Sequence, residues 1–141
     1  MTTTQEASGN YSIAVLDQNG DAAEVAAHLL RALGFEATPF TSIQALQGTI
    51  DTRPFDAYVL PWLVRSINVS ELLAAIRSAD ACCPVVILTG LLLGVARTGE
   101  GSQLASAIET YKLRLCEKPM SMKIIAALLR RDLERPTAVA L

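Results

Sequence analysis

The sequence contains few of the residues that hold small proteins together covalently or give them acid–base chemistry. Its 141 residues include three cysteines, one histidine and 5% aromatic residues. An odd number of cysteines does not form a framework of paired disulfides, and one histidine is too few for most acid–base or metal-binding schemes. We therefore expect no disulfide scaffold, no metal site, no cofactor and no catalytic centre. The chain should rely on a packed core, which a domain of this length can supply.

Strong charge of one sign and long apolar runs are also missing. The formal net charge is −2, so the sequence has no basic surface of the kind that binds nucleic acid. No segment has the length and composition of a signal peptide or a membrane-spanning helix. Unpaired cysteines are typical of a reducing compartment. We expect a cytoplasmic domain that binds neither membranes nor, by itself, nucleic acid.

The cysteines and the histidine have ordinary structural interpretations. Cys82 and Cys83 are adjacent, whereas redox and zinc motifs space their cysteines as in Cys-x-x-Cys. We interpret the pair as small, partly buried residues. His28 lies off the apolar face of its expected helix, with only Glu24 at ligand spacing, and it is expected at the surface.

The stretch 55–62, FDAYVLPW, predicts the central strand of a sheet. Its apolar run is short and nearly continuous, as in parallel strands that helices cover on both faces. Pro61 has no N–H to give to a ladder, so it should end the strand. Open α/β sheets place their binding sites at the carboxyl ends of such strands. The sequence therefore predicts a chemically inert residue where a site is expected.

Strands and helices alternate five times along the chain. This pattern predicts an α/β domain with a parallel sheet and helices on both of its faces. Residues 1–11 are expected to be a disordered tail, residues 12–135 the domain, and residues 136–141 a tail or the start of a linker. The glycine-rich segment 90–102 has no assignable period. The expected strands are 12–16, 35–41, 55–61, 84–89 and 113–117, and the expected helices are 21–33, 42–50, 68–76, 103–111 and 122–134.

Two of these helices have capping signals at their starts. Asp21 can cap the first helix, and Asn68 with Glu71 three positions later is typical of a capping box. The four-residue spacing of large apolar side chains predicts which face of the first helix packs on the sheet. That face is expected to contain Val25, Leu29 and Leu33, with Ala22 and Ala26 beside them.

Three motifs in order give the chain a family resemblance. They are Asp17 at the end of the first strand, Thr89 at the end of the fourth, and Lys118-Pro119 after the fifth. With Phe55-Asp56 leading the third strand, the chain resembles a receiver domain of bacterial two-component response regulators, over nearly all of residues 12–135. The resemblance implies a flavodoxin-like sheet of order 2-1-3-4-5, with its site between strands one and three. It also implies a cis peptide bond before Pro119.

The sequence departs from the family at the residues that carry its chemistry. In receivers, two acidic residues after the first strand hold Mg²⁺, an aspartate after the third accepts a phosphoryl group, and a threonine and a lysine bind its oxygens. Here the acidic pair is Asp17 and Gln18, and Pro61 stands at the acceptor position. Thr89 and Lys118 match the family. The resemblance is therefore to a degenerate, or pseudo-, receiver that has no phosphoacceptor.

Other carboxylates do not replace the missing acceptor. Asp56 lies five residues before Pro61, which places it about 16 Å away at the opposite end of the strand. We interpret Asp56 as a cap or as a partner of a surface cation. The aromatic residue that often precedes the lysine in receivers is matched here by Leu115. Without a phosphoryl group, Lys118 is expected to pair with Asp17, because an unpaired ammonium in a crevice is costly.

Two functions of different kinds follow, and neither makes the domain an enzyme. The first is a phosphorylation-independent signalling module that regulates an output domain or a partner protein in a bacterial two-component-type pathway. The second is a switch that responds to a small ligand or an anion in the vestigial pocket near Lys118 and Thr89. The residues of that vestigial pocket are Asp17, Gln18, Pro61, Thr89 and Lys118.

The last helix predicts a dimer interface. Ile124 and Leu128 stand one turn apart and well away from the apolar stripe that should face the sheet. Receivers that the chain resembles often dimerise through this region, so we expect a homodimer through these two residues. The stripe facing the sheet is expected to contain Met122, Ile125, Ala126, Leu129 and Leu133.

Overall fold

The computed structural model describes residues 10–90, 101–118 and 120–134. Most of the glycine-rich segment, most of the expected N-terminal tail, the C-terminal tail and the peptide bond before Pro119 lie outside these residues. Tyr11, which was expected to belong to the tail, packs partly buried against the core, and its carbonyl accepts a hydrogen bond from the Glu36 N–H. Tyr11 therefore packs as part of the domain.

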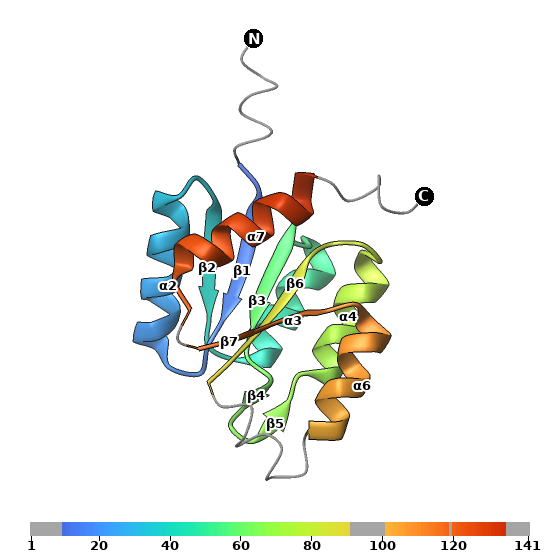
Figure 1. Ribbon diagram of the computed structural model, residues 1–141. Coiled ribbons are helices and arrows are strands. Elements are labelled where there is room, and N and C mark those ends of the chain that lie inside the picture. The colour runs from blue at the N-terminus through green and yellow to red at the C-terminus, as the bar shows by residue number, and fades with distance from the viewer. Residues whose placement is uncertain (1–9, 91–100, 119, 135–141) are drawn as a thin grey trace.

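A five-stranded parallel sheet forms the centre of the molecule (Figure 1). Its strand order is β2-β1-β3-β6-β7, which is order 2-1-3-4-5 when the strands of this sheet are counted along the chain. The predicted α/β, flavodoxin-like fold is confirmed. The elements are β1 Ser12–Leu16, α2 Gly20–Ala32, β2 Glu36–Phe40, α3 Ile43–Thr52, β3 Ala57–Leu60, β4 Leu63–Val64, β5 Ile67–Asn68, α4 Ser70–Ala79, β6 Val85–Thr89, α6 Gly101–Tyr111, β7 Arg114–Glu117 and α7 Met122–Glu134.

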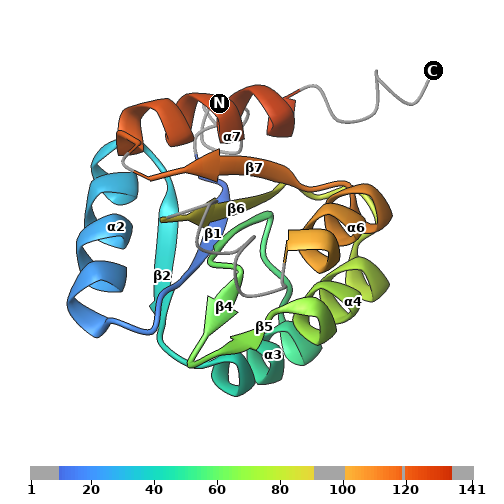
Figure 2. The ribbon, with the colours of Figure 1, turned by 60° about the horizontal axis from the view of Figure 1, so that its bottom comes forward.

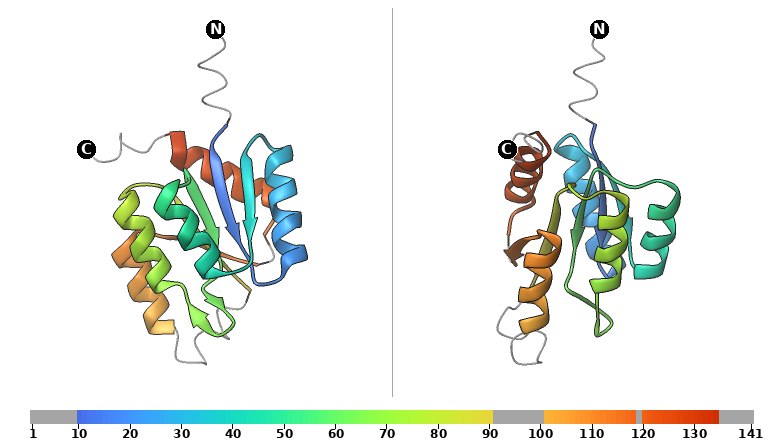
Figure 3. Two further views of the ribbon diagram at one scale, coloured as in Figure 1. Left: turned by 180° about the vertical axis from the view of Figure 1, so that it is seen from behind. Right: turned by 90° about the vertical axis from the view of Figure 1, so that its right-hand side faces the viewer.

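Helices cover both faces of this sheet, as the alternation predicts. Helices α2 and α7 pack on one face, and α3, α4 and α6 pack on the other. Figure 3 shows α3 and α4 in front of the sheet when it is seen from behind. Each layer closes its own hydrophobic cluster, so the sheet is buried on both sides. No helix of the described residues is long and apolar enough to cross a membrane.

The central strand β3 is buried along its whole length. Its side chains alternate between the two clusters, with Tyr58 and Leu60 on the α3, α4 and α6 side and Val59 on the α2 and α7 side. The Tyr58 hydroxyl accepts a hydrogen bond from the Phe55 N–H, and burial raises the pKa of Tyr58 to about 12. The strand predicted from the FDAYVLPW stretch is confirmed, and it ends directly before Pro61.

The predicted capping residues are wrong by one or two positions. Asn19 caps α2, because its Oδ1 accepts from the Ala22 N–H, and Asp21 lies inside the first turn. The expected capping box of α4 does not form. Val69 is the N-cap and makes no side-chain cap, while Asn68 Oδ1 accepts from the Ser70 N–H. In both cases an asparagine just before the helix is the side chain that satisfies a free N–H group of the first turn.

Helix α2 packs through a face that only partly matches the one predicted: Ala26 and Leu33 pack partly buried against the core, but the fully buried residues are others. Its buried residues are Ala23, Ala27 and Leu30. Val25 and Leu29, which were assigned to the core, are 58% and 41% exposed. The spacing of large side chains favoured the wrong face, because the alanines are small enough for the helix to lie close to the sheet. Val25 and Leu29 are thereby left exposed on this helix, while Leu30 packs in the core.

A short β-hairpin follows β3 and was not predicted. Strands β4 and β5 have two residues each and pair antiparallel, Leu63 with Asn68 and Val64 with Ile67. The turn residues Arg65 and Ser66 have φ angles of 53° and 70°, the left-handed region typical of two-residue hairpin turns. Glycine and asparagine are the usual residues there, so the sequence carried no signal for this hairpin.

Candidate functional site

The carboxyl ends of four neighbouring strands bring the predicted site residues together. Asp17 follows β1, Pro61 follows β3, Thr89 ends β6, and Lys118 follows β7. With Gln18 they line one pocket of about 240 Å³, at the end of the sheet that Figure 2 turns toward the reader. The structure thus assembles all five residues of the predicted vestigial pocket. Its other lining residues are Trp62, Leu63, Leu88 and Gly90.

Asp17 and Lys118 form an ion pair across this pocket. The Lys118 Nζ and Asp17 Oδ2 atoms are 3.8 Å apart, so the predicted pairing is confirmed. The lysine side chain is 47% exposed and the aspartate 24%, so water screens the attraction and the pair contributes little stability. The backbone positions both residues: the Lys118 N–H donates to the Thr89 carbonyl, and Asp17 Oδ1 accepts from the Asn19 N–H.

Gln18 is engaged with the hairpin that sequence reasoning missed. Its Oε1 accepts a hydrogen bond of 2.7 Å from the Arg65 N–H at the hairpin turn. This amide oxygen therefore ties β1 to the β4–β5 hairpin. Among the described residues, Asp17 is then the one carboxylate that lines the pocket, and no group of three or more potential metal ligands occurs there.

Pro61 stands where the resemblance places the phosphoacceptor. Its side chain has no nucleophilic or metal-binding atom, and it leads directly into Trp62, whose side chain is buried in the core. The Trp62 carbonyl accepts from the Val69 N–H, which closes the loop that contains the hairpin. Pro61 thus lines the pocket with an apolar ring and adds no charge to it.

The alternative carboxylate Asp56 lies at the opposite end of β3, as predicted. Its Oδ2 accepts hydrogen bonds from the backbone N–H and the hydroxyl of Ser12, at 2.8 and 3.2 Å. Asp56 therefore caps the start of β1, which confirms its interpretation as a cap. Leu115, at the position of the family's aromatic residue, packs partly buried against the α3, α4 and α6 cluster.

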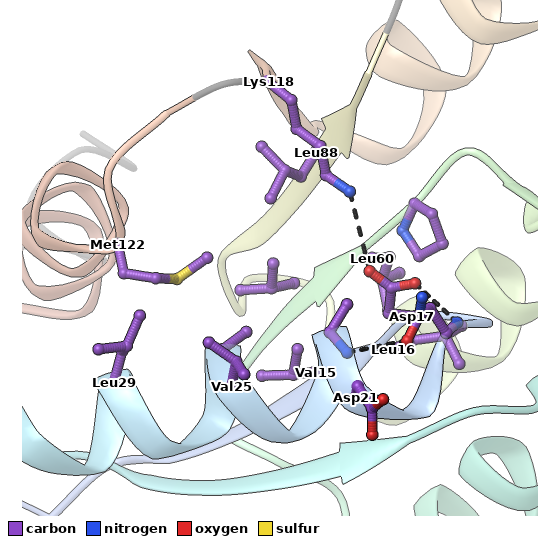
Figure 4. A pocket seen from close by; sticks show the side chains of 15 residues that line it. Val15, Leu16, Asp17, Asp21, Val25, Leu29, Leu60, Leu88, Lys118 and Met122 are labelled. Atoms are coloured by element: carbon purple, nitrogen blue, oxygen red, sulfur yellow. Dashed lines mark hydrogen bonds and ion pairs between the residues drawn. The ribbon is translucent and has the colours of Figure 1, made fainter.

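A second pocket adjoins the first and was not predicted. It lies between α2 and α7, has a volume of about 410 Å³, and shares Asp17, Pro61, Leu88 and Lys118 with the vestigial pocket. Val25 and Leu29 form one of its walls (Figure 4). The prediction missed this groove because it assigned both side chains to the core. The signal that could have revealed it is the pair of alanines, Ala23 and Ala27, one turn apart on α2.

Comparison with known proteins identifies the fold. No protein-family model matches the chain, and no curated protein matches it significantly in sequence. A response regulator receiver domain protein from Clostridium thermocellum is 16% identical, with a TM-score of 0.74 over 93% of this chain and 99% of that one. A CheY-like receiver domain protein from Methanospirillum hungatei is 12% identical, with a TM-score of 0.76 over 89% and 94%. Full-length FixJ from B. japonicum is 21% identical, with a TM-score of 0.72 over 89% and 58%.

These structures share one architecture with the chain over nearly its whole described length. The implied receiver fold is therefore confirmed, including the parallel sheet and the helices on both faces. The chain has the fold of receiver domains from two-component response regulators.

Proposed function

We propose that this domain is a phosphorylation-independent signalling module, a receiver fold that regulates a partner protein or an output domain in a bacterial two-component-type pathway. Pro61 carries the proposal. Phosphoryl transfer to a receiver needs a carboxylate oxygen as nucleophile at the end of β3, and proline offers no such atom.

The residues that would bind Mg²⁺ for phosphoryl transfer also form an incomplete ligand set. Mg²⁺ requires oxygen ligands in near-octahedral geometry and usually takes carboxylates. Asp17 already pairs with Lys118, and the Gln18 oxygen is occupied by the Arg65 N–H. A cation bound through these residues would meet one carboxylate that already attracts Lys118 and one neutral amide oxygen that already accepts a hydrogen bond. The site therefore supports neither the acceptor nor its cation.

Acetyl phosphate tests the proposal directly. We expect no phosphorylated species when the protein is incubated with acetyl phosphate and Mg²⁺, because no carboxylate lies at the acceptor position. Intact-mass spectrometry reports the mass of one added phosphoryl group. A receiver domain that carries the acceptor aspartate, treated in the same way, is the positive control. A phosphoryl group on the wild-type chain would contradict the proposal, whether it is bound as an acid-stable phosphoester or as an acyl phosphate.

The second part of the proposal, an output domain or a partner protein, is supported by comparison with full-length FixJ. The chain covers 58% of full-length FixJ, so a receiver fold of this kind also occurs as part of a larger protein. By analogy, the domain passes its signal to an output domain or to a separate partner. Its own formal charge of −2 gives no basis for direct binding to nucleic acid.

We further propose that the domain acts as a homodimer through α7. Ile124 is 51% exposed on this helix, whose buried face is formed by Ile125, Ala126 and Leu129. Leu128 lies partly buried beside the core, on the side of α7 where Asp132 pairs with Arg114 of β7. A two-fold contact could bury Ile124 against the same helix of a second copy.

Light scattering tests this dimer. We expect twice the monomer mass at micromolar concentration, and a monomer for Ile124→Glu/Leu128→Glu, because two charges from each copy would be buried at the two-fold contact. Ile124→Glu alone is the milder variant, since Leu128 also contacts the core. Ile67→Glu places the same charge on an exposed apolar residue of the hairpin and should leave the mass unchanged. A monomeric wild type, or a dimer that survives in the double variant, would exclude this surface.

The second candidate function is a switch that responds to a small ligand or an anion near Lys118 and Thr89. The open position of the Lys118 side chain favours it, because a half-exposed ammonium at a pocket remains accessible to an anion. We rank it below the first function, because the attraction of an anion is reduced by the neighbouring Asp17 carboxylate.

A further inference from the structure

The groove between α2 and α7 is the larger of the two pockets at the carboxyl end of the sheet. Figure 4 shows Val25 and Leu29 rising from α2, Met122 facing them from the start of α7, and Lys118 with Asp17 at one end. Its volume of about 410 Å³ lies in the range typical of small-molecule sites. The floor is formed by the sheet residues Val15, Leu16, Val59, Leu60 and Leu88.

One wall of the groove is formed by two exposed apolar side chains, Val25 and Leu29, that do not belong to the core. Helix α2 is held on the sheet by Ala23, Ala27 and Leu30, so Val25 and Leu29 contribute little to the core. Large side chains that are exposed together on one wall of a concave surface are typical of a binding site. An occupant with an apolar body would remove both side chains from water.

The polar end of the groove restricts the charge of that occupant. Lys118 Nζ and Asp17 Oδ2 are 3.8 Å apart, which is longer than a hydrogen bond, so each can bind a third group. The pair carries no net charge. An anionic head group would meet Asp17, and a cationic one would meet Lys118. A neutral head group that both accepts and donates hydrogen bonds fits the ion pair without repulsion.

We infer that this groove binds a small amphipathic molecule, with its apolar body between α2 and α7 and an uncharged, amide-like head group between Asp17 and Lys118. The carbonyl of such a head group accepts from the Lys118 ammonium, and its N–H donates to Asp17. This inference goes beyond the proposed function, because it holds whether or not the domain takes up a phosphoryl group.

Three probes with one apolar body and different head groups test the inference. They are hydrocinnamamide, which is neutral, hydrocinnamate, which is an anion, and phenylpropylamine, which is a cation. We expect hydrocinnamamide to shift the backbone amide NMR signals of Val25, Leu29 and Met122 with a dissociation constant in the millimolar range. The two charged probes should bind at least about tenfold more weakly, because each places a like charge beside Asp17 or Lys118.

A matched pair of variants locates the binding. Leu29→Gln keeps the size of the side chain but removes apolar contact, and it should weaken hydrocinnamamide binding about fivefold. Ile67→Gln makes the same kind of change on the exposed hairpin and should leave binding unchanged. Circular dichroism verifies that both variants fold.

Several results would overturn the inference. They are no shift with any probe, equal binding of all three probes, or a Leu29→Gln variant that binds as well as the wild type. A wild-type dimer that becomes monomeric in Leu29→Gln would also overturn it, because the groove would then be covered by a second copy of the chain.

Discussion

Replacing Trp62 with alanine is expected to lower the free energy of unfolding by about 3–5 kcal/mol, the usual range for deleting a buried aromatic side chain. Trp62 is 1% exposed and belongs to the cluster that α3, α4 and α6 close on the sheet. It also follows Pro61 directly and precedes the hairpin. Its loss should therefore open a cavity beneath the vestigial pocket and loosen the hairpin above it.

Urea unfolding followed by circular dichroism measures this effect, because the variant has lost the only tryptophan and its fluorescence. The control is Ile67→Ala on the same hairpin, where the side chain is 63% exposed. We expect that variant to change stability by no more than about 0.5 kcal/mol. A loss of less than about 1 kcal/mol for Trp62→Ala would mean that the site collapses around the cavity more easily than a close-packed core should.

The five strands could be predicted because each carries a local signal. Strands β1, β3 and β6 have the short, nearly continuous apolar run of a strand buried on both faces, whereas β2 and β7 carry weaker signals. The edge position of β2 followed from Pro39, which has no N–H for a further neighbour. The alternation of elements then left few possible topologies, so the strand order followed as well.

The packing face of α2 could not be predicted in the same way. Large and small apolar residues surround much of this helix, so periodicity alone gives two acceptable faces. The choice depends on how close the helix lies to the sheet, which is a tertiary property. Ala23 and Ala27 permit a close approach, and Val25 and Leu29 would not. The groove between α2 and α7 is a consequence of that choice.

The positions of the site residues were predictable, but their bonds were only partly so. Asp17 and Lys118 meet because the ends of parallel strands lie side by side, and opposite charges were expected to pair. The bond from Gln18 to the Arg65 N–H spans 47 positions and ends on a backbone group in a turn. Backbone partners leave no mark in the sequence, so neither the hairpin nor its attachment could be foreseen.

Pro61→Asp alone is expected to leave the protein poorly phosphorylated by acetyl phosphate, although it supplies the acceptor carboxylate. Gln18 would still give Mg²⁺ a neutral amide, whose oxygen is bound to the Arg65 N–H, in place of a second carboxylate. The charge on the phosphoryl group during transfer would then lack its full counter-charge. Intact-mass spectrometry measures the labelled fraction over time.

The double variant Gln18→Asp/Pro61→Asp should be labelled at least about tenfold faster than Pro61→Asp, because it completes both the acceptor and the acidic pair for the cation. Gln18→Asp alone is the matched control: it supplies the acid without the acceptor and should take up no phosphoryl group. Omitting Mg²⁺ should abolish the gain in the double variant, since the new carboxylate acts through the metal. Equal labelling of the single Pro61→Asp variant and the double variant would show that the second acid is dispensable. The missing acceptor at Pro61 would then be the only barrier to the chemistry.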